Sequence, residues 1–263
     1  MRVFLFVPCF VDQLFPNVAV STLRVLRHLG CEVAFPSNQT CCGQPAYNSG
    51  YFDEARLMAM HQINAFMPDG PASTHHSTIH GKAASEFDLK QDYVVGPSGS
   101  CIAMMRNFYP GLLQADQRYS QVAAEFATRI FEFTEFINNV VGVEKFTGKL
   151  NAVVSFHDSC HGLRELGIKQ GPRNILRRIN GLKLIELPYN EVCCGFGGTF
   201  AVKFPEISVA MADEKLKNFD QTKADILVST DTSCLMHLHG RAKRKGFNQR
   251  FAHIAEIMAE SIS

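Results

Sequence analysis

Residues 191–198, Glu-Val-Cys-Cys-Gly-Phe-Gly-Gly, place two adjacent cysteines at the start of a glycine-rich turn. On an extended strand, the side chains of Cys193 and Cys194 would point to opposite faces. A turning backbone of the kind that glycine permits can bring both sulfurs to one side. The same device occurs earlier, where residues 41–45 read Cys-Cys-Gly-Gln-Pro. An unusual arrangement used twice in one chain indicates a duplicated site.

The rest of the chain supports a duplication around these two motifs. Residues 3–9 match residues 153–160, since each is an apolar run that ends in a cysteine. Residues 93–101 align in the same way with residues 226–234, and residues 129–137 align with residues 250–258. The spacing from Cys42 to Cys101 is 59 residues, against 40 from Cys194 to Cys234. The surplus is assigned to an insertion at about 68–90, a stretch rich in Pro, Gly and Ser without a sustained period.

Apolar runs alternate with helical patterns along both halves. The expected strands are 2–8, 31–35, 93–96, 152–156, 182–187 and 225–229. The expected helices are 17–29, 52–66, 81–87, 102–108, 115–140, 172–179, 205–218, 235–245 and 251–261. This alternation predicts two similar α/β domains, 1–142 and 149–263, each with a mostly parallel sheet flanked by helices. The patterned cysteines then lie at the carboxyl ends of strands, where open α/β sheets place their sites.

Composition excludes several classes of protein. The chain has 263 residues, a net charge of +1 and a sequence pI of about 7.6, so no basic excess points to nucleic acid. The apolar start is short and is interrupted by Pro8 and Cys9, which is unlike a signal peptide. No run approaches the ~18 apolar residues of a membrane span. These features predict a cytoplasmic protein without an integral membrane segment.

Nine cysteines in a reducing compartment are typical of metal or redox sites. Thiolates select zinc, Cu(I) and iron–sulfur clusters. The chain contains neither C-x2-C nor C-x4-C, the chelating pairs of structural zinc sites. A vicinal pair with two distant thiols suits an iron–sulfur core that has more than one metal to hold. The predicted ligands are Cys9, Cys41, Cys42, Cys101, Cys160, Cys193, Cys194 and Cys234, with zinc in one half as the alternative.

The chain resembles the cysteine-rich CCG-domain family, which includes the cysteine-rich subunit of heterodisulfide reductase and the iron–sulfur subunits of glycolate oxidase and anaerobic glycerol-3-phosphate dehydrogenase. Within that family it is similar to the lactate-utilisation protein A subfamily. The motifs at 41–45, 97–101, 157–161 and 193–203 support this resemblance, which fails only around 68–90. In the family, C-x-x-C follows the CCG motif. Here Ser98 and Asp231 stand three residues before Cys101 and Cys234, so each half is one thiol short.

The resemblance implies an iron–sulfur subunit of a complex that oxidises L-lactate to pyruvate. One or two clusters of the 4Fe-4S type per chain would transfer electrons, with a ferredoxin-like subunit and a third subunit as partners. No dinucleotide fingerprint is present, so the activity is not expected to depend on NAD, and the subunit is expected to be inactive alone. The alternatives are glycolate or another 2-hydroxy acid as substrate, a heterodisulfide-type thiol–disulfide reductase, and a zinc or thiol scaffold.

Two histidines that flank Cys160 are the candidate catalytic residues. Both could donate a hydrogen bond to sulfur or substrate, and His157 could accept the proton of a hydroxy acid. A structural hydrogen-bonding role is the alternative. The glycines expected to free backbone beside the metal are Gly43, Gly195, Gly197 and Gly198.

The remaining cysteine, histidines and basic run receive simpler interpretations. Cys31 is expected to be a small buried hydrophobe. His237 and His239 are expected to be surface or packing residues. The histidines of the insertion, His75, His76 and His80, are predicted to lie in a solvated loop. The basic run at 241–245 suits the end of a helix, and a partner-docking patch is the alternative.

Overall fold

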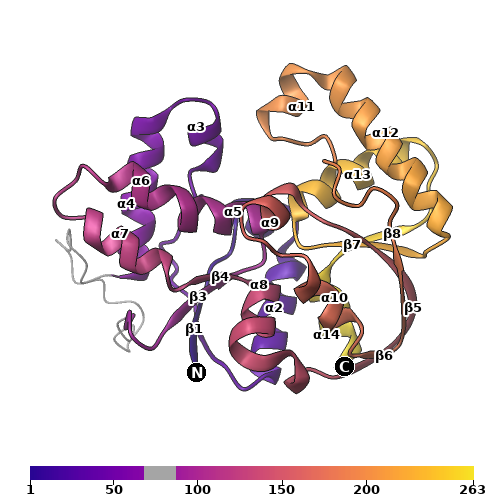
Figure 1. Cartoon of the computed structure of the whole chain (residues 1–263), viewed down its shortest axis with the longest axis horizontal. Helices are drawn as coiled ribbons and strands as arrows, with labels where there is room; N and C mark the ends of the chain where they lie inside the picture. Colours follow the sequence, from indigo (N-terminus) through magenta and orange to yellow (C-terminus); the bar gives the residue numbers. More distant parts are fainter. Residues whose placement is uncertain (68–86) are drawn as a thin grey trace.

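Two parallel four-stranded sheets form the frame of the chain, in a computed structural model that describes residues 1–67 and 87–263 (Figure 1). The first sheet has the order β2-β1-β3-β4 and the second the order β6-β5-β7-β8. The strands are β1 Arg2–Leu5, β2 Glu32–Ala34, β3 Tyr93–Gly96, β4 Ile130–Glu132, β5 Gly148–His157, β6 Ile179–Glu186, β7 Ile226–Ser229 and β8 Arg250–His253. The second order repeats the first with every strand number raised by four, so the predicted internal duplication is present in the topology.

Helices connect the strands, as parallel pairing requires. They are α1 Cys9–Leu14, α2 Pro16–His28, α3 Gln44–Asn48, α4 Phe52–Phe66, α5 Gly99–Ala103, α6 Tyr109–Leu113, α7 Ser120–Ala127, α8 Phe133–Phe136, α9 Cys160–Arg164, α10 Gln170–Leu176, α11 Thr199–Lys203, α12 Pro205–Thr222, α13 Thr232–Arg244 and α14 Ile254–Ser261. Two π-helical turns, Met104–Phe108 and Ile137–Gly142, and a 3-10 turn, Val143–Lys145, complete the set. In the described ranges no helix combines the length and apolar character needed to cross a membrane.

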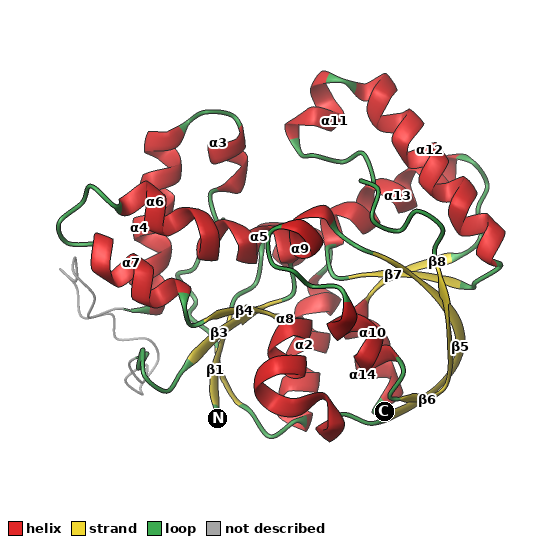
Figure 2. Ribbon diagram, viewed as in Figure 1, coloured by secondary structure: helices red, strands yellow, loops and turns green. Residues whose placement is uncertain are grey.

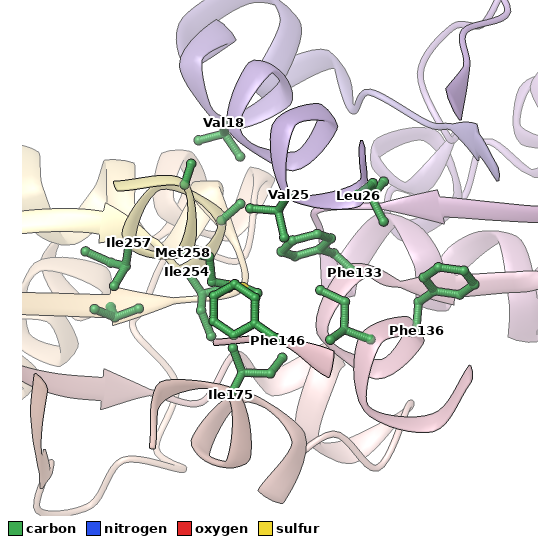
Figure 3. Close-up of a cluster of buried hydrophobic side chains, with 14 of the residues drawn as sticks. Val18, Val25, Leu26, Phe133, Phe136, Phe146, Ile175, Ile254, Ile257 and Met258 are labelled. Atoms are coloured by element: carbon green, nitrogen blue, oxygen red, sulfur yellow. The ribbon is translucent and has the colours of Figure 1, made fainter. Parts of the chain in front are cut away.

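The two halves share one large buried cluster between their sheets, and each also buries a cluster of its own on the outer face of its sheet. Helices α2, α8, α10 and α14 lie between the sheets (Figure 2). Their apolar side chains meet those of both sheets in a single cluster (Figure 3), which includes Val18, Val25, Leu26, Phe133, Phe136, Phe146, Ile175, Ile254, Ile257 and Met258. Burial of apolar surface is the dominant favourable term in folding, so this layer fixes one half against the other.

Alternation along the strands explains why each sheet is covered on both faces. In β1, Val3 and Leu5 point into the shared core, whereas Phe4 packs in a second cluster with α4, α6 and α7. In β7, Ile226 and Val228 face the shared core, and Leu227 packs with α12 and α13. Central parallel strands buried on both faces read as continuous apolar runs, which is why the sequence reveals them.

The predicted helix at 115–140 is wrong, because edge strand β4 interrupts it. The predicted helix at 251–261 is confirmed only from Ile254, because edge strand β8 occupies its first three residues. The two strands lie at equivalent places in the halves. Each is followed at once by a helix whose N-cap, Glu132 or His253, has extended backbone and forms a capping box with Glu135 or Glu256. A short apolar strand that runs into an apolar helix has no polar break, so the pattern reads as one helix.

The cap of α8 makes stability depend on pH. Glu132 is fully buried, and burial raises the pKa of its carboxyl to about 8. The folded chain therefore holds this proton to higher pH than the unfolded chain. The associated stability is complete below the unfolded pKa near 4.5 and is lost as pH rises to about 8, by up to about 1.4 kcal/mol per pH unit.

Substituting Glu132→Gln should remove that loss, because a neutral amide does not titrate. We expect the free energy of unfolding of the variant to increase relative to that of the wild type as pH rises from 4.5 to 8. Urea unfolding followed by circular dichroism measures this difference. Glu54→Gln, at an exposed position of α4, is the control. A wild-type-minus-variant difference that stays flat across this range would contradict the assignment.

Residues 68–86 lie outside the described part of the chain. The predicted helix at 81–87, the three histidines of the insertion and the solvated loop fall almost wholly within this range. These interpretations stay predictions.

Candidate metal centres

The patterned cysteines lie just beyond the carboxyl ends of strands in both halves. Cys9 begins α1 directly after β1, and Cys160 begins α9 directly after β5. Cys101 lies in α5, which follows β3, and Cys234 lies in α13, which follows β7. The vicinal pairs follow β2 and β6. Because these strands are parallel neighbours, their carboxyl ends bring distant cysteines to one edge of each sheet.

In the first half, four sulfurs form a continuous chain of contacts, in the order Cys9, Cys41, Cys42, Cys101. The sulfurs of Cys9 and Cys41 are 3.9 Å apart. Hydrogen bonds from Cys42 and then Cys9 lower the pKa of the Cys41 thiol to about 3. The two thiols that donate to Cys41 have raised pKa values in turn.

The second half repeats this chain, in the order Cys160, Cys193, Cys194, Cys234. The sulfurs of Cys194 and Cys234 are 3.1 Å apart. Hydrogen bonds from Cys160 and then Cys194 lower the pKa of the Cys193 thiol to about 2. The first cysteine of each vicinal pair thus has the lowered pKa in both halves, so the two groups are equivalent in hydrogen bonding as well as in position.

The two groups fit a metal bound by thiolates. Both members of each vicinal pair reach the same side, so four sulfurs converge in each half without a disulfide. Soft sulfur donors without carboxylates among the four suit iron–sulfur clusters or zinc. Tetrahedral zinc with Zn–S bonds of ~2.3 Å has sulfurs about 3.8 Å apart. The 3.9 Å between the Cys9 and Cys41 sulfurs is close to this value, so this distance alone does not exclude zinc in favour of an iron–sulfur cluster.

Glycine supplies the turn that each vicinal pair needs. Gly43 has φ +84° and Gly195 has φ +93°, in the left-handed region. The backbone N–H of Gly195 donates to the Cys193 sulfur at 3.4 Å, and that of Gly43 likewise lowers the pKa of Cys41. Gly197 and Gly198 also have positive φ. These glycines lie beside the sulfurs as predicted, and their role toward a metal stays a prediction.

Replacing Gly195 should disrupt the second site. An added Cβ would lie 2.6 Å from the Ser208 carbonyl oxygen and 2.9 Å from the Met211 Cβ, both on α12. We expect Gly195→Ala to cost about 2–4 kcal/mol in chemical unfolding, from backbone strain and overpacking of about 1–3 kcal/mol each. Gly198→Ala is the matched control, since φ is +60° but nothing lies within 4 Å of its Cβ position. Equal losses in the two variants would contradict this account.

The two positions that lack the family's extra thiol meet each other across the halves. Ser98 caps α5 by accepting from the Cys101 N–H, and Asp231 caps α13 by accepting from the Ser233 N–H. The Asp231 carboxylate also accepts from the Ser100 N–H at 3.0 Å and from the Ser98 hydroxyl at 3.4 Å. Both side chains are almost fully buried. Sequence reasoning treated them as missing ligands and did not foresee this contact between the halves.

The surroundings of the two sites differ in polarity. Phe6, three residues before Cys9, is fully buried and apolar, whereas His157 occupies the same place before Cys160. Gln62 of α4 and Lys215 of α12 also occupy equivalent positions in the two halves. Each lies four residues after the methionine that faces the glycine of its own CCG turn, Met58 or Met211. The second site is therefore bordered by an imidazole and an ammonium group where the first has a phenyl ring and an amide.

Lys215 is a buried cation behind the second site. Its Nζ donates to the carbonyl oxygens of Tyr189, at 2.6 Å, and Asn190. Burial lowers its pKa to about 8, and the nearby thiols of Cys194 and Cys193 limit this decrease. Such a charge stabilises thiolates and other negative charge at the site.

Arg173 forms a second buried charged group, beneath β5. Its guanidinium donates to both carboxylate oxygens of Asp158, at 2.9 and 2.8 Å, and to those of Glu186 at 2.8 and 3.0 Å. Asp158 lies two residues before Cys160, so this ion pair holds the carboxyl end of β5 in place beside the Cys160 thiol.

A cavity of about 110 Å³ opens over the second site, with room for several waters or one small organic molecule. All four cysteines of the second site contribute to its wall. The first half contributes Gln44, Pro45, Asn48 and Ser100, so the cavity lies between the halves. Its wall also includes the Asp231 carboxylate.

The two candidate catalytic histidines have different places. His161 lines the cavity, where Nδ1 lies 3.5 Å from the Cys160 sulfur and Nε2 lies 3.7 Å from a Glu165 carboxylate oxygen. His157 is fully buried and is not among the residues that line this cavity. The catalytic role of either histidine stays a prediction.

Other residues singled out in the sequence have packing roles. Cys31 is 7% exposed within the shared core, as expected. His237 lies against Phe196, and His239 stacks on Phe251, which confirms packing roles for both. In the basic run, Arg241 and Lys245 both pair with Asp213. Much of that charge is thus used within the chain.

Fold and site together define a duplicated α/β protein with four convergent thiols in each half. Comparison with known proteins gives the same class. The sequence profile of the family described as "Cysteine-rich domain" (CCG) matches residues 3–106 and 154–239. The chain therefore belongs to the cysteine-rich CCG-domain family.

The curated relatives are similar over the whole length. "Lactate utilization protein A 2" of Bacillus cereus is 41% identical over 263 residues, covering 100% of both chains. "Lactate utilization protein A" of Exiguobacterium sp. is 43% identical over 261 residues, covering 99% of this chain and 98% of the relative. A solved structure of a hypothetical protein from Helicobacter pylori superposes with a TM-score of 0.59 at 12% identity. It covers 100% of this chain and 49% of that one, and it shows likeness of fold alone.

Proposed function

We propose that this chain is the iron–sulfur subunit of a complex that oxidises L-lactate to pyruvate, and that it transfers electrons through clusters held by its two groups of four cysteines. The observation that supports this most is the convergence of four cysteine sulfurs at equivalent places in the two halves. The similarity to lactate utilization protein A over the full length supports the substrate. We place the two domains at 1–142 and 149–263, in a cytoplasmic complex.

The ligands of the first cluster would be Cys9, Cys41, Cys42 and Cys101, and those of the second Cys160, Cys193, Cys194 and Cys234. When bound, a 4Fe-4S-type cluster supplies one-electron redox chemistry. The glycine turns at Gly43 and Gly195 orient the vicinal thiolates toward it. Lys215 supplies positive charge behind the second group, which favours added negative charge there.

The cavity over the second group favours electron transfer over substrate oxidation on this chain. The wall of this cavity includes the Asp231 carboxylate, which would repel the carboxylate of a 2-hydroxy acid. Oxidation of lactate releases two electrons and two protons, and a ferredoxin-like partner and a third subunit would share that work. If a 2-hydroxy acid does react here, His161 is the residue that lines the cavity and could accept its proton.

The test is whether lactate reduces the clusters of this chain when both partners are present. Protein purified without oxygen should contain iron and acid-labile sulfide, and its visible absorbance should bleach on addition of L-lactate to the complex. Bleaching by glycolate instead would change the substrate. Zinc, or no metal under strictly anaerobic handling, would overturn the electron-transfer role and leave a thiol scaffold.

A thiol–disulfide reductase is the second candidate, because the sulfurs of Cys194 and Cys234 lie 3.1 Å apart beside the cavity. Disulfide formation needs sulfurs to approach within about 2.05 Å, which is a small movement from this position. Reduction of a low-molecular-weight disulfide by the purified complex, without response to lactate, would favour this candidate.

A further inference from the structure

Within the described part of the chain, His157 is a fully buried polar side chain without a hydrogen-bond partner. It ends β5, and its side chain is 0% exposed. Neither ring nitrogen makes a hydrogen bond of normal geometry within the described residues. Burying an imidazole without a compensating hydrogen bond is unfavourable, so such a side chain is expected to bind another group.

Its nearest chemistry is the second group of thiols. One ring nitrogen of His157 and the sulfurs of Cys194 and Cys234 all lie within 4.8 Å of one another. The backbone fixes this placement, because β5 and β7 pair in register from Val154 to His157 and the Ser229 hydroxyl donates to the His157 carbonyl oxygen at 3.0 Å. The imidazole is thus held at the sulfurs by a central strand of the sheet.

The ring nitrogens of His157 are available to bind a ligand. Imidazole nitrogen is a ligand of several metals that thiolates also bind. The Asn190 backbone lies near the ring but forms no hydrogen bond of normal geometry with it, so neither nitrogen is committed elsewhere in the described chain.

We propose that His157 is a nitrogen ligand of the metal group held by the second site, which makes that site a mixed sulfur–nitrogen centre and leaves the first as all-sulfur. The proposal rests on the proposed function of the second site. Position 231, where the family pattern has a further thiol, is an aspartate engaged in helix capping and in the contact with Ser98 and Ser100. His157 is the donor that lies close to the Cys194 and Cys234 sulfurs, whereas His161 lies against the Cys160 sulfur on the cavity side. The first half has Phe6 at the equivalent position, which offers no donor atom.

A nitrogen ligand would give the second centre a different reduction potential from the first. A neutral imidazole in place of a thiolate leaves the metal group less negative, and this raises the reduction potential, as in centres where histidine replaces cysteine. Lys215, which replaces Gln62 of the first half, acts in the same direction. The second centre is therefore the better electron acceptor of the two.

The test isolates the second centre and looks for nitrogen directly. In a Cys41→Ser/Cys42→Ser background, anaerobically prepared and reduced protein is measured by pulsed EPR, with and without 15N-histidine labelling. We expect a strongly coupled histidine nitrogen. The signal should disappear in His157→Phe, which copies the first half, and should be absent from the Cys193→Ser/Cys194→Ser protein.

His157→Cys keeps a donor at this position in case the phenylalanine variant loses its metal. We expect it to retain iron, to lose the nitrogen coupling and to shift the midpoint potential downward in a redox titration. Iron extended X-ray absorption on the same samples reports a nitrogen shell even if the centre has no EPR-active state. Iron without coupled nitrogen, or nitrogen unchanged in both variants, would overturn the proposal. Protein that contains no metal at all would instead overturn the proposed function.

Discussion

Replacing both cysteines of the second vicinal pair with serine should remove about half of the iron and acid-labile sulfide from protein prepared without oxygen. Hydrogen bonds from Cys160 and Cys194 lower the pKa of Cys193, and Cys194 is 2% exposed, in contact with Cys193 and Cys234. Serine keeps the shape but is a poor ligand for soft metals, so the whole group should lose its affinity. Iron and sulfide are quantified per chain beside the wild type.

Matched variants make this result specific to each half. Cys41→Ser/Cys42→Ser should remove the other half of the iron, and the combined variant all of it. Cys31→Ala is the control, since Cys31 lies in the shared core outside both groups and should leave the metal content unchanged. Full iron retention in either serine pair, with a native circular dichroism spectrum, would remove that group from the metal-binding residues.

Removing the Arg173 guanidinium should cost about 3–5 kcal/mol of stability, because Asp158 would be left as a buried, unpaired carboxylate. The Arg173 and Asp158 side chains are 3% and 1% exposed. Asp158 also lies beside Cys160, so the loss should weaken metal binding at the second site. Arg173→Met keeps the apolar stem and removes the charge, and chemical unfolding of metal-free protein measures the cost.

A double-mutant cycle separates the charge from packing. Asp158→Asn in the Arg173→Met background removes the unpaired carboxylate and should recover about 1–3 kcal/mol. Arg177→Met, one turn along the chain at an exposed position, should change stability by less than about 0.5 kcal/mol. If Asp158→Asn recovers nothing, the loss in Arg173→Met comes from packing rather than from an unpaired charge.

Much of the frame could be predicted from the sequence because its signals are local. Strand β7, Ile-Leu-Val-Ser, is buried at every position, and such a run is recognisable without knowledge of its neighbours. Helix α4 begins and ends at the residues expected, Phe52 and Phe66. The repeated thiols then lie at strand ends, because cysteines follow the same elements in both halves.

The edge strands could not be predicted in this way. The backbone of Ile130–Glu132 is extended because its partner Val94–Gly96 lies beside it in space, some 36 residues earlier in the chain. Nothing in the apolar pattern of 129–137 distinguishes a short strand and helix from one helix. The same ambiguity affects β8, because residues 250–258 repeat the apolar pattern of residues 129–137.

The sequence by itself determined the duplication, the α/β class and the eight thiols of the two candidate sites, since all of these follow from residue type and spacing along the chain. Only the tertiary structure decided that the halves share one core, that Ser98 meets Asp231, that the cavity opens over the second site and that His157 lies unpartnered beside Cys194 and Cys234. These features join residues far apart in the chain. They depend on how one sheet packs against the other, which local propensity and periodicity do not encode.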